Sequence, residues 1–164
     1  MELNRTKIVL NREVDMLRLG KMTDYATVIL SFMARNQVKV HAALEIATAT
    51  GVALPTVSKI LKQLVKAQVL SSIRGAKGGY SLVQPPEKIS VASVITALEG
   101  PIALTECSNS EHQCDHVSGC TIGNNWRIVN QSVQKALESV SLADMMLPMQ
   151  PPQEITVPVA SLYH

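Results

Sequence analysis

The sequence predicts a mainly helical fold with a small β-hairpin wing: a winged helix-turn-helix followed by a long C-terminal helix. Two short amphipathic segments on either side of Gly51 have the spacing of a helix-turn-helix. A glycine-rich connection between two short strand-like segments then predicts a hairpin. In the last third of the chain, apolar residues recur at helical spacing over a long stretch.

The N-terminal part of the chain divides into an extension and a first helix. Residues 1–15 carry mixed charge without a clear period, so we interpret them as an N-terminal extension and Met16 as a suitable native start. The first helix is expected to begin near Thr23 or Asp24, because either side chain can cap a helix N-terminus. It is expected to end near Asn36.

The second and third helices are expected to form the helix-turn-helix itself. The second covers about residues 42–50 and stops at Gly51, because glycine permits the sharp turn that follows. The third covers about residues 55–67, with Pro55 suited to its first turn. Its apolar stripe consists of Val57, Ile60, Leu61 and Leu64.

A hairpin and a fourth helix complete the first domain. Residues 69–73 and 80–83 are expected to pair as strands, and the connection over residues 74–79 has three glycines that permit a tight turn. A fourth helix is expected over about residues 91–98. We therefore assign a winged helix-turn-helix domain to residues 16–100.

The last third of the chain is expected to contain a loop, a dimerisation helix and a tail. Residues 101–123 show no period and are interpreted as a loop. A long helix is expected from about 124 to 140, within a dimerisation segment assigned to residues 124–146. Its apolar stripe runs through Ile122, Trp126, Val129, Val133, Leu137 and Val140, and dimerisation is assigned to Trp126, Val129, Val133 and Leu137. Residues 147–164 are rich in proline and are expected to be a disordered tail.

Composition and charge limit the class of protein. Apolar residues make up 46% of the chain and aromatic residues only 3%, so the core must consist of aliphatic side chains. No apolar run approaches the roughly 18 residues of a membrane span, and no secretory pattern is present, so we expect a cytoplasmic protein. Residues 46–86 carry basic but no acidic side chains, whereas residues 99–120 carry acidic but no basic ones. The basic part is suited to a polyanion, although a solvated surface has the same composition.

The helix-turn-helix and its hairpin together predict binding to double-stranded DNA. Ala47, Gly51 and Val57 have the spacing that lets two helices pack closely across a sharp turn, although ordinary helical pairs also show it. The side chains expected to contact bases and phosphates are Thr56, Ser58, Lys59 and Lys62 of the third helix, with Arg74 and Lys77 of the hairpin. The alternative is a structural hairpin with solvated charges. The basic run around these motifs favours DNA binding.

Three cysteines within fourteen consecutive residues are the second notable feature. An odd number argues against a closed set of disulfides, and the spacing of Cys107, Cys114 and Cys120 differs from that of zinc ribbons. Three thiolates can bind an iron–sulfur cluster that takes its fourth ligand from elsewhere. Three structural thiols, a zinc site that uses His112 or His116, and a metal-free thiol switch remain alternatives.

Taken together, these features resemble the Rrf2 family of bacterial winged-helix regulators, whose members include the Isc and Suf cluster-assembly regulators and a nitric-oxide-responsive repressor. The resemblance covers about residues 17–146. Its marks are residues 17–19 and 23–25, the helix-turn-helix, residues 74–80, 98–101 and 141–144, the three cysteines and Trp126. Residues 104–108 and 123–126 are most similar to the Suf-system branch.

The resemblance implies a homodimer in which the long helix crosses to its partner, and cluster ligation by the three cysteines. In the nitric-oxide-responsive branch an aspartate of the other subunit is a ligand, and the matching residue is Asp24, for which helix capping is the alternative role. His116 and His112 are weaker candidates. The histidine that the Isc-type branch has three residues after its last cysteine is replaced by Gly123. Six residues separate Cys107 from Cys114, one more than in that branch. The expected cofactor is an iron–sulfur cluster, with 2Fe–2S favoured and 4Fe–4S as the alternative.

We therefore expect a transcription regulator, a repressor of suf-type cluster-assembly genes that senses cluster status and binds a pseudo-palindromic operator as a dimer. A cluster-free thiol or zinc sensor on the same fold is the first alternative, and an adaptor whose winged helix binds protein is another. An electron-transfer protein or redox enzyme fits less well. The chain has no phosphate-binding glycine loop, no Cys-x-x-Cys pair and no convincing acid–base pair, so we do not expect an enzyme.

Overall fold

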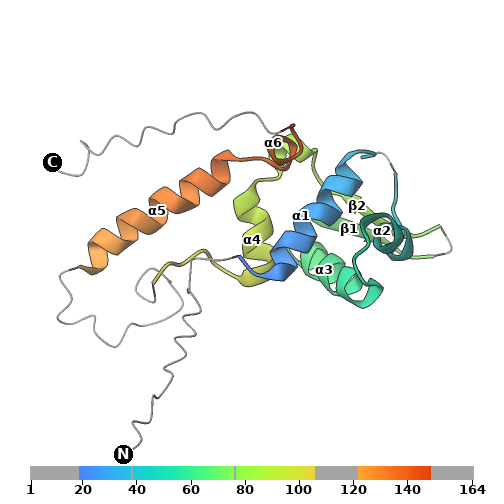
Figure 1. The fold of residues 1–164 in the computed structure, drawn as a ribbon, viewed down its shortest axis with the longest axis horizontal. Helices are drawn as coiled ribbons and strands as arrows, with labels where there is room; N and C mark the ends of the chain where they lie inside the picture. Colours follow the sequence, from blue (N-terminus) through green and yellow to red (C-terminus); the bar gives the residue numbers. More distant parts are fainter. Residues whose placement is uncertain (1–18, 38, 76, 106–121, 149–164) are drawn as a thin grey trace, which may run out of the picture.

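The computed structural model describes residues 19–37, 39–75, 77–105 and 122–148 (Figure 1). The expected N-terminal extension, the three cysteines and most of the expected tail lie outside these residues. The elements in chain order are α1 (Lys21–Ala34), α2 (Ala43–Thr50), α3 (Leu54–Lys66), β1 (Leu70–Ile73), β2 (Gly79–Leu82), the short 3-10 helix η1 (Pro86–Lys88), α4 (Val91–Glu99), α5 (Gly123–Ser139) and α6 (Leu142–Met145). The predicted fold, mainly helical with a two-stranded wing, is confirmed.

One aliphatic core holds the winged domain together. Its fully buried side chains are Ile29, Leu30 and Met33 of α1, Ile46 of α2, Val57, Ile60, Leu61 and Leu64 of α3, and Leu70 of β1. The predicted stripe of α3 therefore faces inward in full. Burial of each such side chain contributes about 1.5–3 kcal/mol.

The turn between α2 and α3 is built as the sequence predicts. Gly51 has a φ of 72°, the left-handed conformation that glycine adopts readily, and its N–H donates to the carbonyl oxygen of Ala47. The chain bends by 120° between the two helices. In the described part of the chain, no single helix has the length and apolarity of a membrane span. Only this bent pair, taken together, is long and apolar enough by length and composition.

The start of α1 differs from the prediction. The helix begins at Lys21, with Gly20 as its N-cap and no side-chain cap, so neither Thr23 nor Asp24 caps it. Instead, Glu99 at the end of α4 accepts hydrogen bonds on Oε1 from the Gly20 N–H (2.7 Å) and the Thr23 hydroxyl (2.5 Å). A carboxylate that is distant along the chain therefore accepts hydrogen bonds from the N-terminus of α1. The helix also ends at Ala34, earlier than the predicted Asn36.

The wing is a short antiparallel hairpin that is attached to the rest of the domain at its base. Leu70 pairs with Leu82 and Ile73 with Gly79, within one residue of the predicted strand limits. Beside the hairpin, His41 of the α1–α2 connection forms an isolated antiparallel bridge with Tyr80 of β2. This bridge fixes the wing against the helix-turn-helix.

The long helix expected over residues 124–140 is α5, and the last residues of the segment assigned to dimerisation form the separate short helix α6. The chain leaves α5 at Val140, which is extended, and α6 begins after Ser141 with a capping box between Ser141 and Asp144. Leu142 is buried in the core, and α6 packs against α1 and η1. In Figure 1, α5 (orange) lies at the edge of the domain on the side of α4, and α6 lies next to α1. Residues 141–146 therefore complete the winged domain.

Candidate functional site

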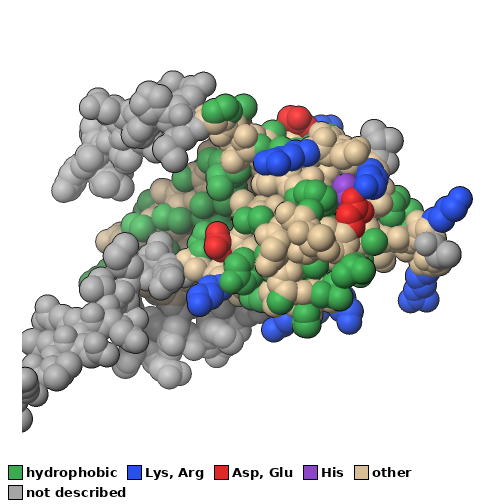
Figure 2. Space-filling view, turned by 45° about the vertical axis from the view of Figure 1, so that its right-hand side comes forward, with side chains coloured by type: hydrophobic (Ala, Val, Ile, Leu, Met, Phe, Trp, Pro, Cys, Tyr) green, Lys and Arg blue, Asp and Glu red, His purple; other side chains and the backbone are tan. Residues whose placement is uncertain are grey.

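The basic side chains singled out from the sequence lie on the surface of α3 and the wing. Lys59 and Lys62 are exposed on α3, and Arg74 and Lys77 are exposed in the hairpin connection. In Figure 1 both elements lie on the side of the molecule away from α5. Figure 2 shows basic side chains projecting from the wing end of the molecule. This arrangement presents positive charge from two elements to one partner.

The two hydroxyl residues of α3 are placed differently from the lysines of that helix. Thr56 and Ser58 are half-buried, so they are less accessible than the two lysines with which they are expected to contact DNA. The reason is that the first turn of α3 lies close to α1. There Thr56 lines a surface pocket of about 460 Å³ together with Asp24, Tyr25 and Val28 of α1 and with the residues 50–53 of the turn.

Asp24 lies at the edge of this pocket. Its side chain is exposed, and among the described residues it makes no hydrogen bond or ion pair. The helix-capping role considered for Asp24 is therefore wrong. The carboxylate therefore lies next to the turn between α2 and α3.

The cysteines Cys107, Cys114 and Cys120, with His112 and His116, lie outside the described residues. The chain that enters this segment is held by Asn130 of α5, which is only 6% exposed. Its Oδ1 accepts from the Leu104 N–H and its Nδ2 donates to the Ile102 carbonyl oxygen, both at 3.0 Å. Helix α5 itself begins at Gly123, three residues after the last cysteine. One helix thus anchors both ends of the cysteine segment.

The described residues do not by themselves assemble a metal site. Within them, no group of three or more His, Cys, Asp or Glu side chains comes together. Asn130 was missed in the sequence analysis, because an amide on a polar helix gives no local signal of burial.

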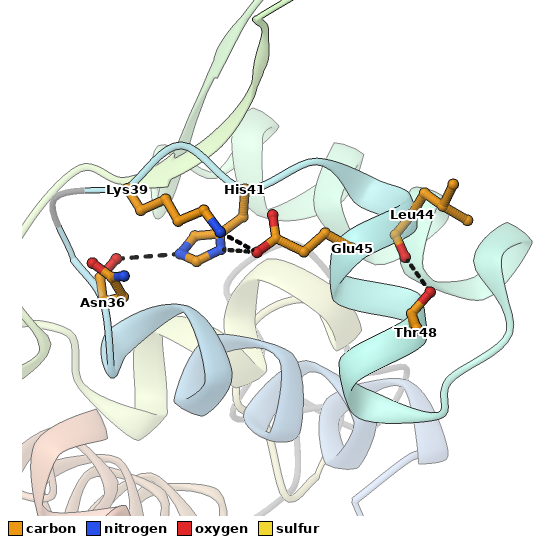
Figure 3. Close-up of polar contacts among 6 residues, drawn as sticks. All are labelled: Asn36, Lys39, His41, Leu44, Glu45 and Thr48. Atoms are coloured by element: carbon orange, nitrogen blue, oxygen red, sulfur yellow. Dashed lines mark hydrogen bonds and ion pairs between the residues drawn. The ribbon is translucent and has the colours of Figure 1, made fainter.

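A second polar cluster, also missed from the sequence, lies at the base of the wing (Figure 3). Lys39 Nζ donates to Glu45 Oε1 at 2.5 Å, and the same oxygen lies 3.5 Å from Nδ1 of His41, which is 2% exposed. The hydrogen bond from Lys39 is the main cause that lowers the pKa of Glu45, and His41 adds to it. The Nε2 of His41 lies 3.2 Å from the Asn36 carbonyl oxygen.

The apolar stripe of α5 is divided between two environments. Val133 and Leu137 are half-buried and line a groove of about 440 Å³ with Leu19, Ile95 and residues 99–104. Trp126 and Val129 are 42% and 43% exposed. The second half of the stripe thus packs on the chain's own winged domain, while the first half is open.

Comparisons with known proteins agree with this geometry. The sequence model of the Rrf2 family, described as an iron-dependent transcriptional regulator, matches residues 19–148. The chain is similar to Protein aau3 of Rhizobium meliloti (strain 1021), with 33% identity over 124 residues that cover 75% of this chain and 76% of that protein. Its fold is similar to that of CymR (YrzC), described as the global cysteine regulator of B. subtilis, with a TM-score of 0.62, 24% identity, and coverage of 80% of this chain and 97% of that one. It is also similar to T. potens IscR, with a TM-score of 0.58, 27% identity, and coverage of 79% and 86%.

Proposed function

This chain belongs to the Rrf2 family of DNA-binding transcription regulators and is not an enzyme, and from this premise we propose that an iron–sulfur cluster on its three cysteines controls how its winged helix binds operator DNA. The genes regulated are those of suf-type cluster assembly, and the chain acts as a repressor and a homodimer. The observation that carries the proposal is the position of Asp24, an exposed carboxylate that has no side-chain partner within the described part of the chain and lies beside the turn of the helix-turn-helix.

The DNA contacts proposed are those of α3 and the wing. Lys59 and Lys62 are exposed on α3 and are suited to phosphates, and the half-buried Thr56 and Ser58 flank them near the start of the helix. Arg74 and Lys77 at the wing tip reach the backbone or the minor groove. A dimer would place two such units on two half-sites of a pseudo-palindromic operator.

The donor set fits an iron–sulfur cluster. Thiolates are the preferred ligands of such clusters, and three of them leave one position for a different ligand. Asp24 is a suitable fourth ligand from the other subunit, since its carboxylate is exposed and unpaired within the described residues. His116 and His112 are alternatives, and the cluster is proposed as 2Fe–2S with 4Fe–4S as the second choice.

The residues around Asp24 suggest how a change at the cluster would alter DNA binding. When bound, the cluster supplies a redox-sensitive and labile centre whose loss releases its ligands. The Asp24 carboxylate shares its pocket with Gly51 and Thr56, so binding at Asp24 bears directly on the α2–α3 turn. The chain then favours one of two orientations of α3, and operator affinity follows that preference.

The experiment that tests cluster binding is purification without oxygen, followed by a visible spectrum and assays of iron and acid-labile sulfide. We expect coloured protein with matched iron and sulfide. The Asp24→Ala variant should keep both but show a shifted spectrum and faster cluster loss, because a ligand has changed. Glu87→Ala, which removes an exposed carboxylate on η1, is the matched control and should behave as the wild type.

Two other results would contradict parts of this proposal. Colourless protein without sulfide, even after attempted reconstitution, would exclude the cluster and favour a thiol or zinc sensor on the same DNA-binding fold. An Asp24→Ala variant with an unchanged spectrum would exclude Asp24 as a ligand, and the His116→Ala and His112→Ala variants would then be compared.

A further inference from the structure

The buried imidazole of His41 lies where the helix-turn-helix and the wing meet. Its backbone N–H donates to the Tyr80 carbonyl oxygen and its carbonyl oxygen accepts from the Tyr80 N–H, both at 2.9 Å. Tyr80 belongs to β2, three residues after Lys77 of the wing tip. The backbone of His41 therefore attaches β2 of the wing to the α1–α2 connection.

The close approach at this point depends on Gly79. A Cβ atom at position 79 would lie 2.5 Å from the His41 carbonyl oxygen and 2.9 Å from the Val40 side chain. No real side chain fits at such distances, so the wing can lie against residue 41 only because residue 79 is glycine. Small changes at His41 will therefore alter the position of the wing.

Both nitrogens of the His41 ring face oxygen atoms that accept hydrogen bonds. Nε2 faces the Asn36 carbonyl oxygen, which can only accept, so this nitrogen carries a hydrogen. Nδ1 faces the Glu45 carboxylate and has no hydrogen-bond partner among the described residues. A neutral ring thus leaves a buried lone pair facing a negative charge, whereas a protonated ring forms an ion pair with Glu45 there.

The other groups around the ring come from each neighbouring element. Helix α1 contributes the Phe32 ring, in an edge contact with a centroid distance of 5.3 Å. The α1–α2 connection contributes Lys39, whose ammonium shares the same oxygen of Glu45 and competes with His41 for it. Strand β2 contributes Tyr80 through its backbone. Glu45 is thus the negative charge that the described residues bring to this ring.

We propose that protonated His41 is a positioning residue for DNA binding: it pairs with Glu45 and holds the wing in the orientation that DNA requires. The inference rests on the proposed DNA-binding role of the wing and is independent of the cluster. Because the proton favours the attached wing and DNA selects that same state, DNA binding and proton uptake are linked. Affinity for DNA is therefore expected to rise as the pH falls.

The test measures affinity for a duplex that the wild-type protein selects from a random-sequence library at pH 7. Fluorescence anisotropy at constant ionic strength gives Kd at pH 6, 7 and 8. We expect binding about two- to fivefold tighter at pH 6 than at pH 8, the range set by a partly exposed ion pair. His41→Gln keeps an N–H for the Asn36 carbonyl oxygen but cannot titrate, and Glu45→Gln keeps an acceptor for Lys39 but has no charge. Both variants should lose this pH dependence.

His164→Gln is the matched control and should keep the pH dependence of the wild type, since it also removes one histidine. Thermal unfolding establishes whether the variants are folded. If His41→Gln does not fold, Glu45→Gln is used for the comparison, because Glu45 is only half-buried and its replacement disturbs the core less. Equal pH dependence in the wild type and in Glu45→Gln would overturn the inference while DNA binding stands. Failure of the wild type to select any duplex would overturn the proposed function as well.

Discussion

Glu99 and Asn130 each hold a segment that is far away along the chain. Glu99 accepts hydrogen bonds from Gly20 and Thr23, which lie 79 and 76 residues before it. Asn130 uses both ends of its amide to hold the backbone of residues 102–104. A buried amide with two good partners is stabilising, and each lost partner costs about 1–3 kcal/mol. These two side chains fix the helix that carries Asp24 and the segment that leads to the cysteines.

At the scale of single residues, the prediction concerns the contribution of Arg74 and Lys59 to DNA binding. Replacing either by alanine should weaken DNA binding, because an exposed cation that meets a phosphate is lost. The slope of log K against log salt should fall by about 1 for each contact removed. Filter binding or anisotropy over a series of salt concentrations measures that slope.

Lys88→Ala is the matched control for these variants. Lys88 is an exposed lysine of η1, outside α3 and the wing, so its removal should leave the salt slope unchanged. If Arg74→Ala, Lys59→Ala and Lys88→Ala all bind with the wild-type slope, the proposed DNA-binding face is wrong.

At this scale the sequence predicts residue types better than contacts. The exposed lysines of α3 follow from helical periodicity, and so does its buried stripe. The N-terminal cap of α1 was mispredicted because local rules favour Thr23 or Asp24, whereas the actual acceptor comes from α4. The His41 cluster could not be predicted either, because it depends on the approach of β2 to the α1–α2 connection.

At the scale of elements, α6 is the least expected part of the fold. The Ser141 side chain accepts from the Asp144 N–H, and the Asp144 carboxylate accepts from the Ser141 hydroxyl and N–H. The hydrogen bond from the Ser141 side chain is the main cause that lowers the pKa of Asp144. Because this folded-state pKa is depressed, the stabilisation is present at neutral pH and is lost as the pH falls through it.

Leu142 provides the prediction for this element. It is 2% exposed and belongs to the core of the winged domain, so Leu142→Ala should lower the free energy of unfolding by about 2–5 kcal/mol. Urea denaturation measures the change. Leu147→Ala is the control, because that leucine is largely exposed, and its effect should stay within about 0.5 kcal/mol. Equal effects of the two substitutions would contradict the placement of α6 in the core.

The sequence predicts most elements within two residues, because helical periodicity, Gly51 and the glycine-rich hairpin are strong local signals. It ended the long helix near residue 140 but did not predict α6 as a helix of its own. Residues 124–146 contain no proline or internal glycine to end a helix, and the actual break comes from the capping box and from the burial of Leu142.

At the scale of the whole molecule, α5 has an apolar surface that the described residues leave open. Ile122, Trp126 and Val129 are exposed near its start, whereas Val133 and Leu137 are partly covered by the groove next to α4. An open stripe of this kind on a helix is suited to the same stripe of a second copy, as in a two-fold symmetric dimer.

Val129→Asp should therefore weaken the proposed dimer by about tenfold or more, because a charge would be buried in an apolar interface. Sedimentation over a range of concentrations measures this equilibrium. Gln131→Asp adds the same charge at an exposed position of α5 outside the stripe and should leave the dimer unchanged. A wild-type protein that is monomeric at all concentrations would rule out this interface.

The most direct test of the central claim is the operator affinity of anaerobically purified protein, measured before and after its iron is removed by chelation. The account predicts that the two affinities differ by about tenfold or more, within the usual range of coupling between two sites. Asp24→Ala should reduce that difference. Equal affinity with and without iron, while Arg74→Ala still weakens binding, would contradict cluster control and leave a DNA-binding protein that responds to another signal.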